Sequence, residues 1–184
     1  MKKYFTILMA VLCLCAFSFD ADAKTRKKTR KRSATSLTEG YYYIRSSVDP
    51  NYVIDVFECR AENLNNVHLW SYYAGESQKW YLEHVGRFDG KGVYKIHSAL
   101  DYDYVLDLAP NTGNVCLYED CSLDSQKWLL KKSGKNTYNI ECYYNNGLEM
   151  LDLDGAIAVD GRNIQVYDAN WTNAQYWILE RASD

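Results

Sequence analysis

Short segments that alternate apolar and polar residues recur along residues 43–177. They are rich in Val, Ile, Leu and Tyr, and Gly, Asn and Asp gather between them, which is typical of strands joined by turns. Three kinds of segment can be aligned, and their copies are Tyr43–Ile44, Tyr94–Ile96 and Tyr138–Ile140; Ile54–Val56, Leu106–Leu108 and Leu151–Leu153; and Val67–Trp70, Val115–Tyr118 and Ile164–Tyr167. The pattern therefore predicts an all-β chain.

A Gln-x-Trp tripeptide closes each copy of this series. It occurs as Gln78-Lys79-Trp80, Gln126-Lys127-Trp128 and Gln175-Tyr176-Trp177, with the tryptophans 48 and then 49 residues apart. Self-similarity at a fixed period indicates a repeat architecture, here three units of four strands. A propeller normally has roughly four to eight blades, so we expect a single closed β domain with pseudo-threefold symmetry instead.

The N-terminal residues 1–23 have the features of a secretory signal peptide. Lys2 and Lys3 precede an apolar run from Tyr4 to Phe19, and Ala21-Asp22-Ala23 forms a small-x-small cleavage site. A membrane anchor is the alternative, but so short an apolar run seldom spans a bilayer. We expect a secreted, periplasmic or cell-surface protein with no membrane span after leader removal.

A basic arm, residues 24–36, follows the leader. Lys24 to Arg32 holds seven basic residues in nine, whereas residues 33–184 hold 12 Lys and Arg against 22 Asp and Glu, a net charge of 12 minus 22, or −10. Such a like-charge block is expected to be a solvated, disordered arm, either a plain linker or a contact for anionic polymers. Because the folded part is acidic and the protein is exported, nucleic acid is not an expected partner.

The cysteines and histidines indicate neither a metal site nor a fixed disulfide pattern. Four cysteines remain after leader removal, and their three possible pairings stay open: Cys59, Cys116, Cys121 and Cys142. His68, His84 and His97 have no ligand-like spacing to them. We expect no metal and no cofactor.

Strand alternation places one acid, one polar residue and one aromatic residue of each repeat away from the core. In Ile54-Asp55-Val56 the aliphatic side chains point one way and the Asp55 carboxylate the other. An acid accepts hydrogen bonds from sugar hydroxyls, and an aromatic ring packs on the C–H face of a pyranose. The candidate binding residues are Asp55, His68 and Trp70; Asp107, Cys116 and Tyr118; and Asp152, Gln165 and Tyr167. Each Asp could instead cap the turn that follows it.

The three Gln-x-Trp motifs and these segments resemble the ricin-type β-trefoil lectins over residues 37–182. The resemblance implies a β-trefoil with repeats at about 37–88, 89–134 and 135–182, each able to hold one shallow sugar site. It carries the binding roles onto the nine candidate residues and favours galactose-type glycans. The Gln of each motif is expected to support the site, and its Trp to lie in the core; the supporting residues are Gln78, Gln126 and Gln175.

The chain departs from the family pattern at several of these positions. The family commonly has Asn before the closing Gln, where this chain has Ser77, Ser125 and Ala174, so we expect one hydrogen bond fewer in each site. The second repeat has Cys116 in place of the usual Gln and is four residues shorter between Asp107 and Val115. The third site is therefore expected to be the best, the first next, and the second degenerate.

Three classes of function are compatible with this pattern. The leading hypothesis is an exported, non-catalytic lectin, and the alternative is a trefoil that contacts proteins or polyanions through degenerate sugar sites. An enzyme is not expected. The candidate acid pairs for glycoside hydrolysis, Asp101 with Asp103 and Asp152 with Asp154, lie in turn-like stretches where acids are usually solvated.

Overall fold

A computed structural model describes residues 37–183, which contain twelve β-strands and five short 3₁₀ turns. The leader and the whole basic arm, residues 1–36, lie outside the described residues. No α-helix occurs within residues 37–183, which confirms the all-β prediction. The strands are β1 (Gly40–Ser46), β2 (Tyr52–Val56), β3 (Asn65–Ser71), β4 (Lys79–Phe88), β5 (Lys91–Ser98), β6 (Tyr104–Leu108), β7 (Val115–Glu119), β8 (Trp128–Lys132), β9 (Thr137–Cys142), β10 (Glu149–Leu153), β11 (Arg162–Asp168) and β12 (Trp177–Arg181).

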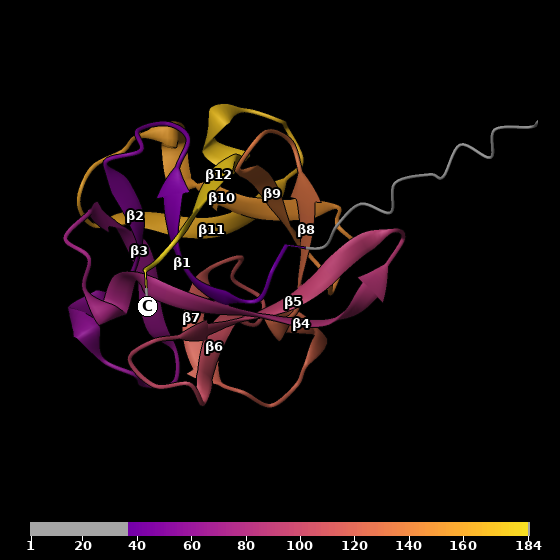
Figure 1. Ribbon diagram of the computed structural model, residues 1–184, viewed down its shortest axis with the longest axis horizontal. Coiled ribbons are helices and arrows are strands. Elements are labelled where there is room, and N and C mark those ends of the chain that lie inside the picture. The colour runs from indigo at the N-terminus through magenta and orange to yellow at the C-terminus, as the bar shows by residue number, and fades with distance from the viewer. Residues whose placement is uncertain (1–36, 184) are drawn as a thin grey trace, which may run out of the picture. The chain divides into compact units, whose positions relative to one another are not determined.

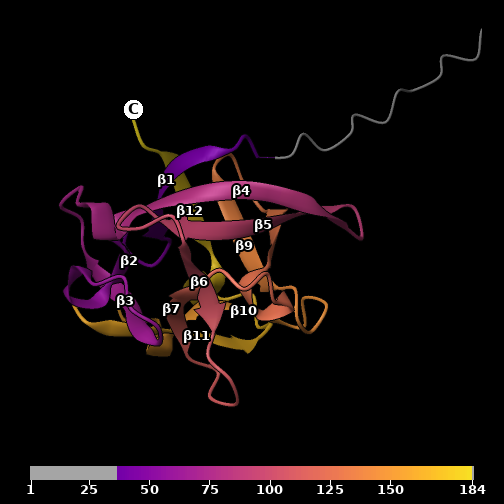
Figure 2. The ribbon, with the colours of Figure 1, turned by 90° about the horizontal axis from the view of Figure 1, so that it is seen from below.

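Six of these strands close into a barrel. Antiparallel pairing runs from β1 to β4, β5, β8, β9 and β12 and returns to β1. The other six form the hairpins β2–β3, β6–β7 and β10–β11, one in each repeat, and these pair with one another. Figure 2 shows the hairpins gathered below the barrel strands β1, β4 and β5, and Figure 1 shows them spread around it. This arrangement is the β-trefoil.

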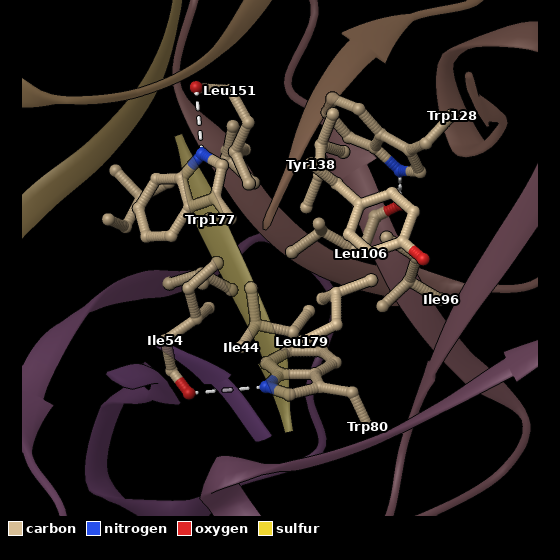
Figure 3. Close-up of a cluster of buried hydrophobic side chains, with 14 of the residues drawn as sticks. Ile44, Ile54, Trp80, Ile96, Leu106, Trp128, Tyr138, Leu151, Trp177 and Leu179 are labelled. Atoms are coloured by element: carbon tan, nitrogen blue, oxygen red, sulfur yellow. Dashed lines mark hydrogen bonds between the residues drawn. The ribbon is translucent and has the colours of Figure 1, made fainter. Parts of the chain in front are cut away.

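The three tryptophans of the Gln-x-Trp motifs lie in the core and hold the hairpins to the barrel. Each is fully buried, and its indole Nε1 donates a hydrogen bond to a backbone carbonyl on the second strand of its own repeat. The pairs, drawn in Figure 3, are Trp80 with Ile54 at 3.1 Å, Trp128 with Leu106 at 3.0 Å and Trp177 with Leu151 at 3.0 Å. Each accepting residue directly precedes the candidate Asp of its repeat. The core tryptophan therefore fixes the strand that carries the acid.

Three asparagines at equivalent positions form a closed ring of hydrogen bonds between the hairpins. Asn114 donates to Asn66 at 2.9 Å, Asn66 donates to Asn163 at 3.1 Å, and Asn163 donates to Asn114 at 2.8 Å. Each lies directly before the apolar start of the third strand of its repeat. The ring satisfies one donor and one acceptor on every side chain, so it specifies how the three hairpins pack.

The four cysteines of the folded part are free thiols. Cys59 and Cys121 are exposed, whereas Cys116 and Cys142 are buried. Burial raises the pKa of Cys116 to about 12 and that of Cys142 to about 11, so both stay protonated near neutral pH. The trefoil is therefore stabilised by its core and its hydrogen bonds, and not by disulfide bonds among these four cysteines.

Candidate functional site

The three candidate acids occupy equivalent places on β2, β6 and β10. Asp55, Asp107 and Asp152 are only 4%, 6% and 5% exposed. Strand alternation does turn them away from the aliphatic core, but the loop before each Gln-x-Trp motif covers them. The acids are thus turned away from the core but are nearly buried, and a ligand can reach one only where a hollow opens beside it.

The first repeat has such a hollow, of about 310 Å³, and Asp55, His68 and Trp70 all line it. The imidazole of His68 stacks on the indole of Trp70, with ring centroids 5.2 Å apart and 25° between the planes. Its Nε2 lies 3.6 Å from Asp55 Oδ1. Trp70 is 38% exposed while His68 is buried. The hollow thus offers an aromatic surface near solvent and a carboxylate deeper inside.

Sequence reasoning missed Tyr73, which also lines this hollow. Its hydroxyl shares a 2.6 Å hydrogen bond with Ser77 Oγ, and Ser77 Oγ donates to Asp55 Oδ2 over 3.3 Å. Burial raises the pKa of Tyr73 to about 12, so the phenol stays protonated. Serine is also a donor, so Ser77 keeps a polar group at the position before Gln78, and the expected loss of one hydrogen bond in this site stays a prediction. The sequence did contain a signal for this residue, because Tyr73 comes three positions after Trp70, the aromatic residue of the third strand.

The third repeat has a similar hollow of about 320 Å³, lined by Asp152, Gln165 and Tyr167. Gln165 Nε2 donates to Asp152 Oδ1 over 3.4 Å, so the amide lies beside the acid. Tyr167 is 53% exposed. Ala174 stands where the first repeat has its serine and provides no donor, as expected.

The second repeat brings its residues together differently. The hollow beside it is lined by Leu108 and Ser125, but Asp107, Cys116 and Tyr118 are not among its lining residues. Gln126 Nε2 donates to Asp107 Oδ2 at 3.0 Å, while Oδ1 is buried and has no hydrogen-bond partner within the described part of the chain. Asp107 thus lines no hollow within the described residues, and the degenerate second site expected from sequence stays a prediction.

The glutamines of the closing motifs brace the loops over the acids. Gln78 accepts from Tyr73 N at 2.9 Å and donates to Ser71 O at 3.0 Å. Gln126 and Gln175 make the equivalent pairs of bonds in their own repeats. Each Gln thus ties the end of the third strand to the loop that follows it, which fixes the edge of the hollow.

The ionisation of Asp152 gives the third hollow a testable pH dependence. Burial raises the pKa of this carboxyl; hydrogen bonds from Gln165 and Gln175 lower it, and the nearby Asp154 raises it further. A sugar hydroxyl donates to the ionised form, so affinity is full above this pKa and is lost as the pH falls through it. Because the pKa is raised, the loss begins at a higher pH than for an ordinary Asp.

We expect this loss in an Asp55→Ala variant, in which the third hollow remains, when lactose binding is measured by calorimetry from neutral to acidic pH. Asp152→Asn on the same background is the control and should bind weakly with little pH dependence. Constant affinity of the Asp55→Ala protein down to the ordinary pKa of Asp, near 4, would contradict the assignment.

Within residues 37–183, no group of His, Cys, Asp and Glu side chains is arranged to hold a metal ion. No helix in that part of the chain is long and apolar enough to cross a membrane.

Residues 76–167 match the family described as ricin-type beta-trefoil lectin domain-like. This chain belongs to the ricin-type β-trefoil lectin family. The match covers the second repeat and parts of the other two, so the family resemblance and the β-trefoil expected from sequence are both confirmed. A comparison with curated proteins found no match.

Solved structures give this lectin-family chain the same fold. The designed threefold-symmetric protein ThreeFoil is 27% identical with a TM-score of 0.69, over 78% of this chain and 99% of ThreeFoil. The Rhizoctonia solani agglutinin is 19% identical with a TM-score of 0.67, over 80% of this chain and 98% of the agglutinin. The ricin B-like lectin of Macrolepiota procera, solved in complex with lactose, is 20% identical with a TM-score of 0.62, over 80% and 100% of the two chains.

Proposed function

We propose that this protein is an exported, non-catalytic lectin that binds glycans through the hollows of its first and third repeats. Membership of a lectin family supports carbohydrate binding. The observation that carries the assignment to residues is that Asp152 and Tyr167 line one hollow, as Asp55 and Trp70 line another. An acid beside an exposed ring provides both parts of sugar recognition.

Two shallow hollows on one rigid body suit multivalent glycans. Each buries few ligand atoms, so a single site binds weakly. Simultaneous occupation of both raises the apparent affinity for branched or polymeric glycans without any new contact. The lactose bound by the Macrolepiota procera lectin makes galactose-terminated glycans the first class to test.

The acid pairs considered for hydrolysis have structural partners. Asp101 Oδ1 accepts a hydrogen bond from Asp103 N at 3.0 Å, which is a turn cap. Asp154 Oδ2 accepts from Arg162 Nη1 at 3.0 Å. These contacts, together with a family that is generally non-catalytic, support binding rather than hydrolysis.

A screen of the purified protein on immobilised glycans tests the proposal. We expect retention on glycans ending in galactose or N-acetylgalactosamine, stronger for branched than for single-chain presentations. Absence of binding to every glycan on the array contradicts it. The export part is tested separately by finding the mature protein, without residues 1–23, outside the cytoplasm of the producing cell.

Contact with anionic polymers is a second candidate function, favoured by a cationic hollow on the folded part. This hollow, of about 300 Å³, is lined by Arg87, Lys91, Lys131 and Lys132. Leu37 also lines it, and in sequence Leu37 comes five residues after Arg32, the last residue of the basic block. We expect deletion of residues 24–32 to weaken retention on heparin, and Lys131→Ala/Lys132→Ala to weaken it further, while lactose binding is unchanged. Unaltered heparin retention in both variants would dismiss this role.

A further inference from the structure

The cationic hollow lies at the end of the barrel opposite the hairpins. β4 and β8 each run away from a hairpin, and the turns after Phe88 and Lys132 carry the chain back into β5 and β9. Residues at these turns line the hollow, and so does Leu37, which precedes β1. Figure 2 shows the turn between β4 and β5 at the right, away from β2 and β3, the strands of the Asp55 hollow. The two hollows are therefore on different parts of the molecule.

Positive charge is concentrated at this end of an acidic body. The folded part holds 12 Lys and Arg against 22 Asp and Glu. The charged residues that line the hollow are all cations, Arg87, Lys91, Lys131 and Lys132. Lys91 pairs with Glu141, whereas Lys131 and Lys132 are exposed and form no ion pair within the described part of the chain. Such a distribution attracts a flat anionic surface to one end of the molecule and repels it from the rest.

An exposed indole lies beside these lysines. Lys131 Nζ is 4.2 Å from the centroid of the Trp171 ring, and Trp171 is 48% exposed. Val85, two residues before Arg87 on β4, is 39% exposed. Tryptophan next to lysine is typical of residues at the interface between a bilayer and water, because the ring enters the headgroup layer while the cation contacts phosphate. An anionic polymer in solution has no apolar layer to receive the ring.

The fold does not require a tryptophan at this place. Trp171 has a φ of 58°, and the residues at the same distance before the closing Gln in the other repeats, Ala74 and Ser122, have φ of 61° and 57°. Gln175 holds this loop, because its Oε1 accepts a hydrogen bond from Trp171 N at 3.1 Å. A bulky residue is uncommon in this left-handed region and costs free energy. A large exposed ring where the other repeats have a small side chain indicates a role outside the fold.

We propose that the barrel end opposite the hairpins docks this protein on an anionic lipid bilayer, with Lys131 and Lys132 on the phosphate headgroups and Trp171 inserted among them. The proposal rests on the second candidate function, contact through the cationic hollow, and names a lipid surface as the partner. The basic block of the arm is joined to the chain at this end, since Leu37 comes five residues after Arg32. Docking leaves the hollow of Asp55 open to solvent.

The test measures sedimentation of the full protein with vesicles of phosphatidylcholine alone and of phosphatidylcholine with phosphatidylglycerol. We expect binding only where phosphatidylglycerol is present, and weaker binding at high salt. Lys131→Ala/Lys132→Ala should lower the partition coefficient roughly thirtyfold, since each lysine near an anionic surface contributes about a factor of five. Because both lysines are exposed, circular dichroism should be the same for the variant and the wild type.

Lys79→Ala/Lys127→Ala is the matched control. It removes the same charge from two lysines near the starts of β4 and β8, at the other end of these strands, where they pair with Glu76 and Asp124. Charges more than a Debye length from the bilayer, about 10 Å at 0.1 M salt, are largely screened. The control should therefore bind the vesicles within about twofold of wild type.

Trp171→Ala distinguishes a bilayer from an anionic polymer. We expect this variant to bind the phosphatidylglycerol vesicles roughly tenfold more weakly and to be retained on heparin like the wild type, because only the bilayer takes up the indole. Equal vesicle binding by Trp171→Ala and wild type would overturn the lipid proposal in favour of polymer contact. Retention on heparin without any vesicle binding would do the same and leave the second candidate function standing.

Two further results would overturn the docking of the folded part. One is an equal loss of vesicle binding in Lys131→Ala/Lys132→Ala and in the control pair, which would reflect net charge alone. The other is a lysine pair that has no effect once residues 24–32 are deleted, which would assign the binding to the basic block. Lactose takes no part in these measurements, so failure of the sugar hollows does not affect them.

Discussion

The variant Asp55→Ala/Asp152→Ala is expected to lose measurable affinity for lactose while its fold stays intact. Each carboxylate lies inside its hollow and offers the charged acceptor for sugar hydroxyls. A hydrogen bond to a charged group contributes about 1.5–3 kcal/mol, so each change lowers the affinity of its site roughly tenfold to a hundredfold. On a surface of clustered glycans the two losses multiply, because avidity needs both sites.

Calorimetry with lactose and retention on a glycan surface measure this loss, with the single variants as intermediates. Asp168→Ala is the matched control, since Asp168 is an exposed acid next to Tyr167 on β11 and lines neither hollow. The double variant could instead bind lactose within about twofold of wild type, a difference of roughly 0.4 kcal/mol. That result would mean that the two acids do not contribute to lactose binding.

Replacing Trp177 by alanine is expected to destabilise the domain to the point of unfolding. The side chain is fully buried, and truncating a buried tryptophan costs about 3–5 kcal/mol. The change also leaves the carbonyl of Leu151 without its indole donor. Because small domains are stable by only about 5–15 kcal/mol, the loss takes a large share of the total.

Trp177→Phe separates the two contributions. It keeps a ring in the core but removes the hydrogen bond to Leu151, which precedes Asp152. We expect a smaller loss of stability, about 1–3 kcal/mol, together with weaker glycan binding by the third repeat. Urea unfolding measures both variants, with Trp171→Ala as control because Trp171 is 48% exposed. A Trp177→Ala protein as stable as this control would mean that the core does not depend on the motif tryptophan.

The repeat period and strand alternation were sufficient to predict a closed all-β domain of three units, and the family resemblance identified it as a β-trefoil. Three Gln-x-Trp motifs at intervals of 48 and 49 residues indicate three equivalent units, and only a closed β domain accommodates so few. The structure adds the reason for the motif. Its Gln ends a 3₁₀ turn and braces the loop, and its Trp anchors the strand that carries the acid.

The sequence predicted on which face the candidate residues lie, but not how open the hollows beside them are. Alternation gives the face of Asp55, Asp107 and Asp152, yet exposure depends on loops from more distant residues. The shorter segment after Asp107 in the second repeat was visible in sequence, but the hollow beside it is also lined by Tyr144 and Glu149 of the next repeat. Likewise, the ring of Asn66, Asn114 and Asn163 was hidden because an Asn before a strand resembles an ordinary turn residue.

A crystal structure of the protein soaked with lactose tests the central claim most directly. We expect sugar in the hollows of the first and third repeats, with hydroxyls within hydrogen-bond distance of Asp55 and Asp152 and a pyranose face against Trp70 or Tyr167. Lactose bound only elsewhere on the molecule, or both hollows empty at saturating sugar, would contradict the account.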